Sequence, residues 1–202
     1  MLLNMNRSRV SKRSRRHTAD DSDDSDEEEK NVVRVYKHTI YYRGGIQEPH
    51  ATDFCIALRK MEDELWDTGG CITVRLTSNG GSVFAGMCMY DAIRQCNVRV
   101  RVVAEGFVAS AATFVMLGST ERAMSRTSVL LVHAISTWMV GRHKPKDLKE
   151  ELLNCETLMR IITDLYRTQT SISETELKKL FDTDLYMCAD DCMRYGFVTE
   201  IV

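Results

Sequence analysis

The chain has 202 residues, a formal net charge of −2 from 27 basic and 29 acidic side chains, and a hydrophobic content of 44%. This length is typical of about one domain, and the hydrophobic content allows a substantial core. The near-neutral charge argues against a basic nucleic-acid-binding surface spread over the whole chain. No segment approaches the ~18–20 consecutive apolar residues of a transmembrane helix, so we expect no membrane contact.

Charge is segregated near the N-terminus. Six basic residues and no acid lie within 1–17, and eight acids with a single lysine lie within 20–30. A segment this poor in apolar side chains cannot bury enough surface to offset its conformational entropy. We therefore predict a disordered charged tail over 1–30, solvated rather than bound to nucleic acid or an anionic surface. One folded domain is expected over 31–202.

The seven cysteines form an odd set without a CxxC pair, and the first residues lack the ~7–15 residue apolar core of a secretory signal. Free thiols in such a chain are typical of a reducing compartment, so we expect a cytoplasmic protein. Cys188 and Cys192 are four residues apart and can share a helix face. One such pair supplies too few ligands for zinc, so we expect no bound metal.

Strand patterns alternate with helical patterns in the first half of the chain. Glycines are expected to end several of the strands, including Gly80 and Gly81 after the third strand and Gly106 after the fourth. The predicted strands lie at 32–36, 40–42, 72–76 and 98–103.

Two helices are predicted between these strands. The first follows Asp53 and ends near Gly69, because apolar side chains recur there at i, i+4, i+7 and i+11. The second follows the Gly80-Gly81 turn. We expect four apolar side chains on its inner face: Val83, Met87, Tyr90 and Ile93.

The second half of the chain is predicted to be mainly helical. Residues 109–117 are apolar nearly all round, which is typical of a helix buried in the middle of a fold. Residues 129–132 form a buried strand that leads into His133. A long helix begins near Pro145, a residue suited to the first helical turn. Its apolar face is expected to contain Leu148, Leu152, Cys155, Met159, Ile162 and Tyr166.

Two short helices complete the predicted domain. Ser173 and Glu176 form a capping-box pattern that opens the first, and the second ends at Gly196. Repeated strand–helix alternation followed by a helical half predicts an α/β layered domain with right-handed crossovers.

Ser110 is the first candidate for chemistry. It follows a predicted strand and opens the buried helix, with the small residues Ala109 and Ala111 on either side. Small neighbours allow close approach of a substrate backbone, and the unpaired N–H groups of a helix N-terminus can hold a developing oxyanion. On position alone, however, a helix-capping serine is the simpler interpretation. Ser110 gains interest only if a base lies nearby.

His133 supplies a candidate base, because it ends an apolar strand at which a side chain can emerge from a sheet edge. A third group should orient its imidazole. The Gly80-Gly81 turn can expose backbone N–H groups to a substrate carbonyl. Sequence spacing alone does not select the acid among four late candidates: Asp182, Asp184, Asp190 and Asp191.

Taken in order, these features resemble the Clp protease proteolytic subunit, the serine peptidase of the caseinolytic family. Segment 77–87, TSNGGSVFAGM, looks like that family's SPGGSVxAGxxIYD run, and 106–112, GFVASAA, is similar to its GxAASMGA nucleophile motif. His133 occupies the position of the histidine in the family's HQP. Segment 183–198, TDLYMCADDCMRYGFV, looks like the RDxxxxAxEAxxYGLVD ending. The resemblance covers roughly 38–202.

The resemblance implies a Clp protease/crotonase-like layered fold of repeated β-α units, with a long handle helix over 146–168. It implies a Ser-His-Asp triad in which Ser110 is the nucleophile, His133 the general base and Asp184 the acid that orients the imidazole. The backbone N–H groups of Gly81 and Ala111 would form the oxyanion hole.

The same resemblance implies the working assembly. Two stacked heptameric rings would enclose the serines, so that only unfolded or threaded polypeptides reach them. Hydrolysis itself would need no cofactor in this subunit, and an ATP-driven AAA+ unfoldase would supply the threading.

The sequence also departs from the family pattern. Asn79 replaces the proline before the two glycines, Ala134 and Ile135 replace Gln-Pro after His133, and Ala111 replaces the common Met. Thr73 and Arg75 stand where many members place aromatic residues for docking the unfoldase, and the gating loop at the N-terminus is not recognisable.

These departures leave the triad positions intact and favour a divergent member of bacterial, phage or organellar origin. A phage capsid or scaffold maturation protease of the same family is one alternative. A catalytically silent ring subunit is another, and an acyl-CoA enzyme of the related crotonase fold is a third.

Overall fold

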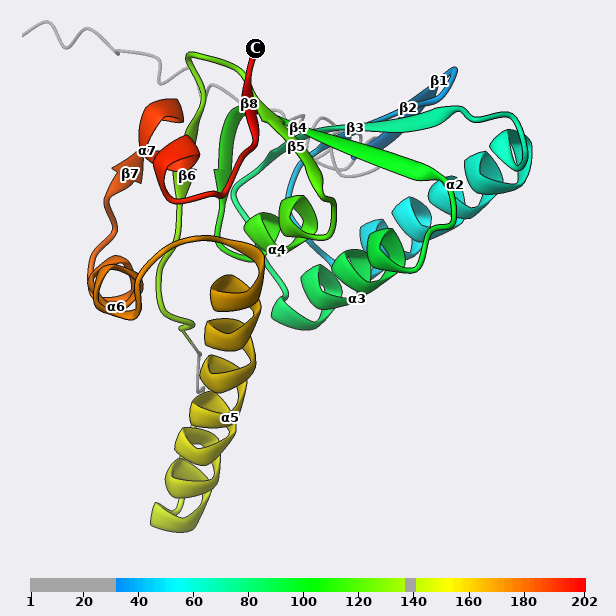
Figure 1. The fold of residues 1–202 in the computed structure, drawn as a ribbon. Coiled ribbons are helices and arrows are strands. Elements are labelled where there is room, and N and C mark those ends of the chain that lie inside the picture. Colours follow the sequence, from blue (N-terminus) through cyan, green and yellow to red (C-terminus); the bar gives the residue numbers. More distant parts are fainter. Residues whose placement is uncertain (1–31, 137–140) are drawn as a thin grey trace, which may run out of the picture. The chain divides into compact units, whose positions relative to one another are not determined.

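The computed structural model describes residues 32–136 and 141–202. Its centre is one sheet in the order β1-β2-β3-β4-β5-β8, to which β6 and β7 are attached through β4 (Figure 1). The β1–β2 and β6–β7 pairs are antiparallel, and the other pairs are parallel. The strands are β1 Val33–Tyr36, β2 Thr39–Arg43, β3 Cys71–Ser78, β4 Arg99–Ala109, β5 Glu121–Met124, β6 Val129–Leu131, β7 Tyr186–Met187 and β8 Glu200–Ile201.

Helices connect these strands as the predicted α/β alternation requires. The expected fold class is therefore confirmed, including a long helix in the C-terminal half. The helices are α2 Glu48–Leu65, α3 Val83–Arg94, α4 Ala111–Leu117, α5 Pro145–Gln169, α6 Glu174–Phe181 and α7 Ala189–Arg194.

Strand β4 continues past Gly106, where the sequence predicted that it would end. The first part of β4 pairs with β5 and its last three residues pair with β6. Gly106 has φ +63, and the register of the β3–β4 pair shifts between Leu76 and Ser78. A glycine within a strand often marks such an irregularity. Here it allows one long strand to change partners and to carry Ala109 to the edge where β6 lies.

Several helix boundaries differ from the predictions. Helix α2 begins at Glu48, five residues before Asp53, because Pro49 is tolerated in the first turn. It ends at Leu65 rather than near Gly69. Helix α4 begins at Ala111, since residues up to Ala109 belong to β4. Strand β5 was not predicted at all.

The predicted inner face of α3 is only partly right. Ile93 is buried as expected, whereas Val83, Met87 and Tyr90 are partly exposed. Ala85, Gly86 and Met89 are buried instead. An added Cβ at Gly86 would lie 2.9 Å from the carbonyl oxygen of Ala111, so α3 and α4 approach each other closely there. This close contact, rather than the hydrophobic pattern alone, determines which side of α3 is buried.

The core lies between the sheet and the helices α2, α3 and α4 (Figure 1). Ile72, Val74 and Leu76 of β3 alternate inward and are fully buried. The intervening Arg75 points to the other side of the sheet, where Glu105 of β4 pairs with both Arg75 and Arg43. The polar side of the sheet is therefore held by cross-strand ion pairs.

Helix α5 is buried only near its C-terminal end. Ile162 and Tyr166 are buried, whereas Leu148 and Leu152 are 51% and 59% exposed. Figure 1 shows the first turns of α5 extending away from the other helices. The continuous apolar stripe predicted for this helix thus includes residues that the rest of the described domain does not cover. A long exposed apolar stripe is typical of a contact surface.

Candidate active site

Ser110 occupies the junction between β4 and α4 in a backbone conformation that is rare for a non-glycine residue. Its φ and ψ are 54° and −128°. Its N–H donates to the carbonyl of Leu131 at 2.9 Å, and its own carbonyl accepts from the N–H of Thr113 at 2.9 Å. Surrounding structure must hold such a residue in place, at a cost of ~1–3 kcal/mol, and residues of this kind concentrate at functional sites.

The Gly80-Gly81 turn packs directly against Ser110. A Cβ at Gly80 would lie 2.7 Å from Cβ of Ser110, so only glycine fits. The φ angles of Gly80 and Gly81 are +90 and +147. The turn is anchored on its other side by Ile46, whose N–H donates to the carbonyl of Gly80 at 2.8 Å and whose carbonyl accepts from Ser82 at 2.8 Å.

Two backbone N–H groups beside Ser110 have no partner. None of the hydrogen bonds formed within 32–136 and 141–202 uses the N–H of Gly81 or of Ala111. Ala111 is the first residue of α4, where a helix leaves its N–H groups unsatisfied. An added Cβ at Gly80 would lie 3.2 Å from the backbone nitrogen of Ala111, so the turn and this helix start are in contact. These two N–H groups can donate hydrogen bonds to a carbonyl oxygen.

His133 lies near Ser110 because of strand pairing. Strand β6 runs parallel to the end of β4, with Leu131 opposite Ala109. His133 follows β6 by two residues and is partly exposed. The sheet therefore brings together the backbones of two predicted site residues that are 23 positions apart in the chain.

Asp184 precedes β7 by two residues, and β7 pairs with the strand that leads into His133. Strand β7 is antiparallel to β6, with Leu131 opposite Tyr186, and the N–H of Ala134 donates to the carbonyl of Phe181 at 3.3 Å. Segments 131–134 and 181–186 thus run side by side in opposite directions. The Ala134–Phe181 hydrogen bond lies two residues out of the Leu131–Tyr186 register, so pairing brings the 182–184 segment alongside His133 without selecting one acid within it. The Asp184 side chain is exposed.

The other acidic candidates have different surroundings. Asp182 is the C-terminal cap of α6. Asp190 pairs with Arg126 at 2.7 Å, and Asp191 pairs with Arg194 at 2.7 Å, both on or beside α7. Asp182 and Asp184 are therefore the two candidates on the segment alongside His133, and the motif at 183–198 favours Asp184. Within the part of the chain that the structure describes, no side-chain hydrogen bond joins Ser110, His133 and Asp184. Catalytic contacts of this kind often tighten only when substrate binds.

Arg122 stabilises this region but was not predicted from the sequence. Arg122 is only 9% exposed, and its guanidinium donates at 3.0 Å each to the carbonyls of Ser119, Gln169 and Gly196. Burial lowers the pKa of Arg122. Gln169 and Gly196 bracket the segment that carries Asp184, so Arg122 holds both ends of it. An arginine at an inward-facing position of a short strand is the signal that could have identified it.

A second missed residue is Thr113, the one polar side chain in the apolar run 111–117. It is fully buried, and its hydroxyl donates to the carbonyl of Ser110 at 2.6 Å. A hydroxyl in an otherwise apolar helix needs a partner, and that requirement was visible in the sequence.

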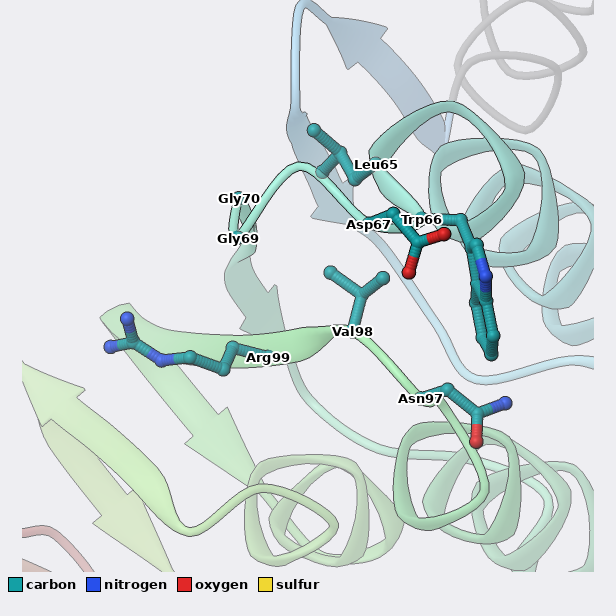
Figure 2. A pocket seen from close by; sticks show the side chains of 8 residues that line it. All are labelled: Leu65, Trp66, Asp67, Gly69, Gly70, Asn97, Val98 and Arg99. Atoms are coloured by element: carbon teal, nitrogen blue, oxygen red, sulfur yellow. The ribbon is translucent and has the colours of Figure 1, made fainter.

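A pocket of about 200 Å³ lies far from these residues. Figure 2 shows its lining at the start of β3 and β4, including Trp66, Gly70 and Arg99. Strand β4 has 11 residues, so at ~3.3 Å per residue its start is roughly 30–35 Å from Ser110. This pocket contains none of the candidate catalytic residues.

In the ranges 32–136 and 141–202, no group of three or more His, Cys, Asp or Glu side chains is arranged to hold a metal ion. All seven cysteines are free thiols. Among the described helices, none is both long enough and apolar enough to cross a membrane.

The chain was compared with known proteins. Curated relatives include an ATP-dependent Clp protease proteolytic subunit from Mesostigma viride, 28% identical over 84% of this chain and 73% of the relative. A second such subunit, from Borreliella burgdorferi, is 26% identical over 81% of this chain and 83% of the relative.

Solved structures agree on the fold. A point mutant of ClpP1 from Listeria monocytogenes matches with a TM-score of 0.73 at 24% identity, over 82% of this chain and 91% of that chain. The profile of the Clp protease family matches residues 24–202. The chain therefore belongs to the Clp protease family, and it carries the strand, helix and glycine turn that meet around Ser110.

Proposed function

We propose that the protein is a serine endopeptidase of the Clp type, which hydrolyses peptide bonds of unfolded or threaded polypeptides. The observation that carries this proposal is the backbone arrangement around Ser110. A strained serine at a strand–helix junction lies against a glycine turn, beside the strand that leads into His133. The pairing of β7 with β6 supports an acid from the segment before β7, and the motif at 183–198 favours Asp184.

In the proposed mechanism, Oγ of Ser110 attacks the carbonyl carbon of the scissile peptide while the imidazole of His133 takes the hydroxyl proton. Collapse of the tetrahedral intermediate breaks the C–N bond, and His133 returns the proton to the departing amine. Water then attacks the acyl-enzyme by the same steps and restores Ser110. The carboxylate of Asp184 accepts a hydrogen bond from the imidazole and stabilises its protonated form.

The N–H groups of Gly81 and Ala111 are proposed to hold the oxyanion. Ala111 follows Ser110, and Gly81 follows Gly80, the glycine that packs against Ser110. Neither N–H is used in a hydrogen bond among the described residues, so both are available to a substrate oxygen. A single donor of this type is typically worth ~2.7–4 kcal/mol of transition-state stabilisation.

We further propose that the subunit works in a ring assembly, two stacked heptamers by family resemblance. The exposed Leu148, Leu152 and Leu153 on α5 supply apolar surface for such contacts. A separate AAA+ unfoldase would deliver substrates using ATP, and this subunit itself would need no cofactor. Arg75 is ion-paired to Glu105 on the open side of the sheet, where an apolar docking contact was expected from the family. Binding of an unfoldase is therefore expected to differ from the usual mode.

The test is intact-mass analysis after treatment of the assembled protein with a fluorophosphonate. Wild type and a Ser125→Ala control should each gain one adduct, and Ser110→Ala should gain none. An adduct that persists in Ser110→Ala would show that another residue is the nucleophile. An unlabelled wild-type ring would overturn the peptidase assignment in favour of a catalytically silent subunit, and a chain that remains monomeric would overturn the proposed assembly.

A further inference from the structure

A buried chain of hydrogen bonds connects helix α5 to the proposed oxyanion hole. Oγ1 of Thr113 lies 2.6 Å from the carbonyl oxygen of Ser110 and 2.5 Å from the hydroxyl oxygen of Tyr166. Thr113 is 0% and Tyr166 1% exposed, so water does not compete for either hydroxyl. The three groups come from the start of α4 and from the last turns of α5.

The direction of these hydrogen bonds follows from counting protons. The carbonyl oxygen of Ser110 can only accept, so the single hydroxyl proton of Thr113 is donated to it. The Tyr166 hydroxyl must then be the donor to Oγ1 of Thr113. Burial raises the pKa of Tyr166, which keeps its hydroxyl protonated and able to donate. The Tyr166 hydroxyl thus donates to the Thr113 hydroxyl, which in turn donates to the carbonyl oxygen of Ser110.

The acceptor carbonyl belongs to the peptide unit that carries the N–H of Ala111. Because a peptide unit is planar, fixing the C=O of Ser110 also fixes the direction of this N–H. Hydrogen bonds to the carbonyl oxygen also polarise the unit and strengthen its N–H as a donor. Ser110 holds an unfavourable backbone conformation, so this peptide depends on external contacts for its orientation.

The ring of Tyr166 also packs against the segment that leads to Asp184. It packs against the rings of Phe114, Phe181 and Phe197, with centroids 5.9, 5.9 and 5.8 Å away. The carbonyl of Phe181 accepts from the N–H of Ala134, the residue after His133. Tyr166 is therefore packed between the helix that follows Ser110 and the segment that precedes Asp184.

We infer that Thr113 and Tyr166 are positioning residues that orient the Ser110–Ala111 peptide so that the N–H of Ala111 faces the oxyanion. Neither residue touches the substrate. The inference deepens the proposed function and rests on it, because the oxyanion hole exists only if Ser110 is a nucleophile.

The test compares isosteric variants in steady-state hydrolysis of a fluorogenic peptide by the assembled protein. Thr113→Val removes the hydroxyl and keeps the shape, Thr113→Ser keeps the hydroxyl, and Tyr166→Phe removes only the distal donor. Thr163→Val is the matched control, since the Thr163 hydroxyl bonds only to the Met159 carbonyl within α5.

We expect Thr113→Val to lower kcat about 10- to 100-fold with KM within about twofold, because the affected contact acts on the transition state. Tyr166→Phe should lower kcat about three- to tenfold. Thr113→Ser should restore most of the activity, and Thr163→Val should match wild type. The double variant Thr113→Val with Tyr166→Phe should have no lower kcat than Thr113→Val alone, because Tyr166 acts through Thr113.

Stability provides an independent readout. Thr113→Val leaves the Tyr166 hydroxyl buried without a partner, so adding Tyr166→Phe should raise the thermal midpoint of that variant. Lowered midpoints with unchanged kcat, or additive losses of kcat, would overturn the positioning role while the peptidase assignment stands. A wild-type assembly without hydrolysis would instead overturn the proposed function and, with it, this inference.

Discussion

Ser110 and Asp184 have opposite surroundings although strand pairing brings their backbones to one region. Ser110 lies between the fully buried Ala111 and Ala109, which is 2% exposed, and hydrogen bonds hold both its N–H and its carbonyl. Asp184 lies on the exposed segment that joins α6 to β7, and β7 itself has only two residues. The side of the proposed nucleophile is thus held by the core, whereas the side of the proposed acid is held by one short strand pair and by Arg122 at its ends.

This difference indicates which groups of the candidate site are held in place by contacts within a single chain. The serine, the glycine turn and the unpaired N–H groups are fixed by close packing, which is insensitive to partners. An exposed carboxylate on a short segment has few contacts to define its position, so its position is less firmly fixed.

Ser110→Ala should lower peptide hydrolysis by at least ~10³-fold, because no other group replaces the nucleophile. Ser110→Gly should be equally inactive and yet more stable than Ser110→Ala. Glycine relieves ~1–3 kcal/mol of backbone strain, which exceeds its extra entropic cost of ~0.5–1 kcal/mol. Thermal unfolding of the two variants checks this. Equal midpoints would mean that the nucleophile side is not strained as described.

Asp184→Asn should lower kcat by roughly 10²–10⁴-fold, because an amide cannot stabilise the protonated imidazole. Asp190→Asn is the control, since its carboxylate pairs with the exposed Arg126. That variant should retain nearly full activity. Comparable losses in the two variants, measured with the same fluorogenic peptide, would show that Asp184 is not the acid that orients His133.

Gly80→Ala should destabilise the nucleophile side by ~3 kcal/mol or more, since its Cβ would lie 2.7 Å from both Cβ of Ser110 and the carbonyl oxygen of Ala109. Gly69→Ala is matched for positive φ, at +71, and has nothing within 4 Å of the added Cβ. It should cost only ~1–2 kcal/mol. Denaturant unfolding of both variants measures the difference, and similar costs would contradict tight packing of the turn.

Arg122→Lys should cost ~1.5–3 kcal/mol of unfolding free energy, because a lysine cannot reach three carbonyls in the fork geometry of a guanidinium. Arg126→Lys, which changes an exposed ion pair, should cost no more than ~1 kcal/mol. Hydrogen exchange should quicken over 170–195 only in the Arg122 variant. Amide hydrogen exchange that quickens equally around Ser110 would show that the segments around Ser110 and Asp184 unfold together.

Removal of residues 1–30 should have the smallest effect. The acidic and basic runs provide little apolar surface to bury, so we expect the thermal midpoint and the peptide hydrolysis rate to change only slightly. Calorimetry and the fluorogenic assay on the shortened chain measure both. A fall of the midpoint by more than about 5 °C would show that the tail contributes to the fold.

The sequence predicted the regular parts of the fold well. Alternating apolar residues identified β3, and a continuous apolar run identified β6. Ser173 caps α6 by accepting from the N–H of Glu176, and Pro145 begins α5. It was wrong at Gly106 and on the inner face of α3, because a strand that changes partners and a close helix contact depend on segments distant in the chain. Periodicity describes only neighbours along the chain.

For the candidate site, the order of motifs alone determined the family and the residues to consider, because Gly-Gly, Ser110 and His133 each require a particular residue type at one place. Only the tertiary structure decided which groups lie together. Pairing of β7 with β6 brings the segment that carries Asp182 and Asp184 alongside His133, and packing of α5 on α4 brings Tyr166 to Thr113. Such contacts join residues tens of positions apart, and they arise from strand pairing and close packing that no local pattern encodes.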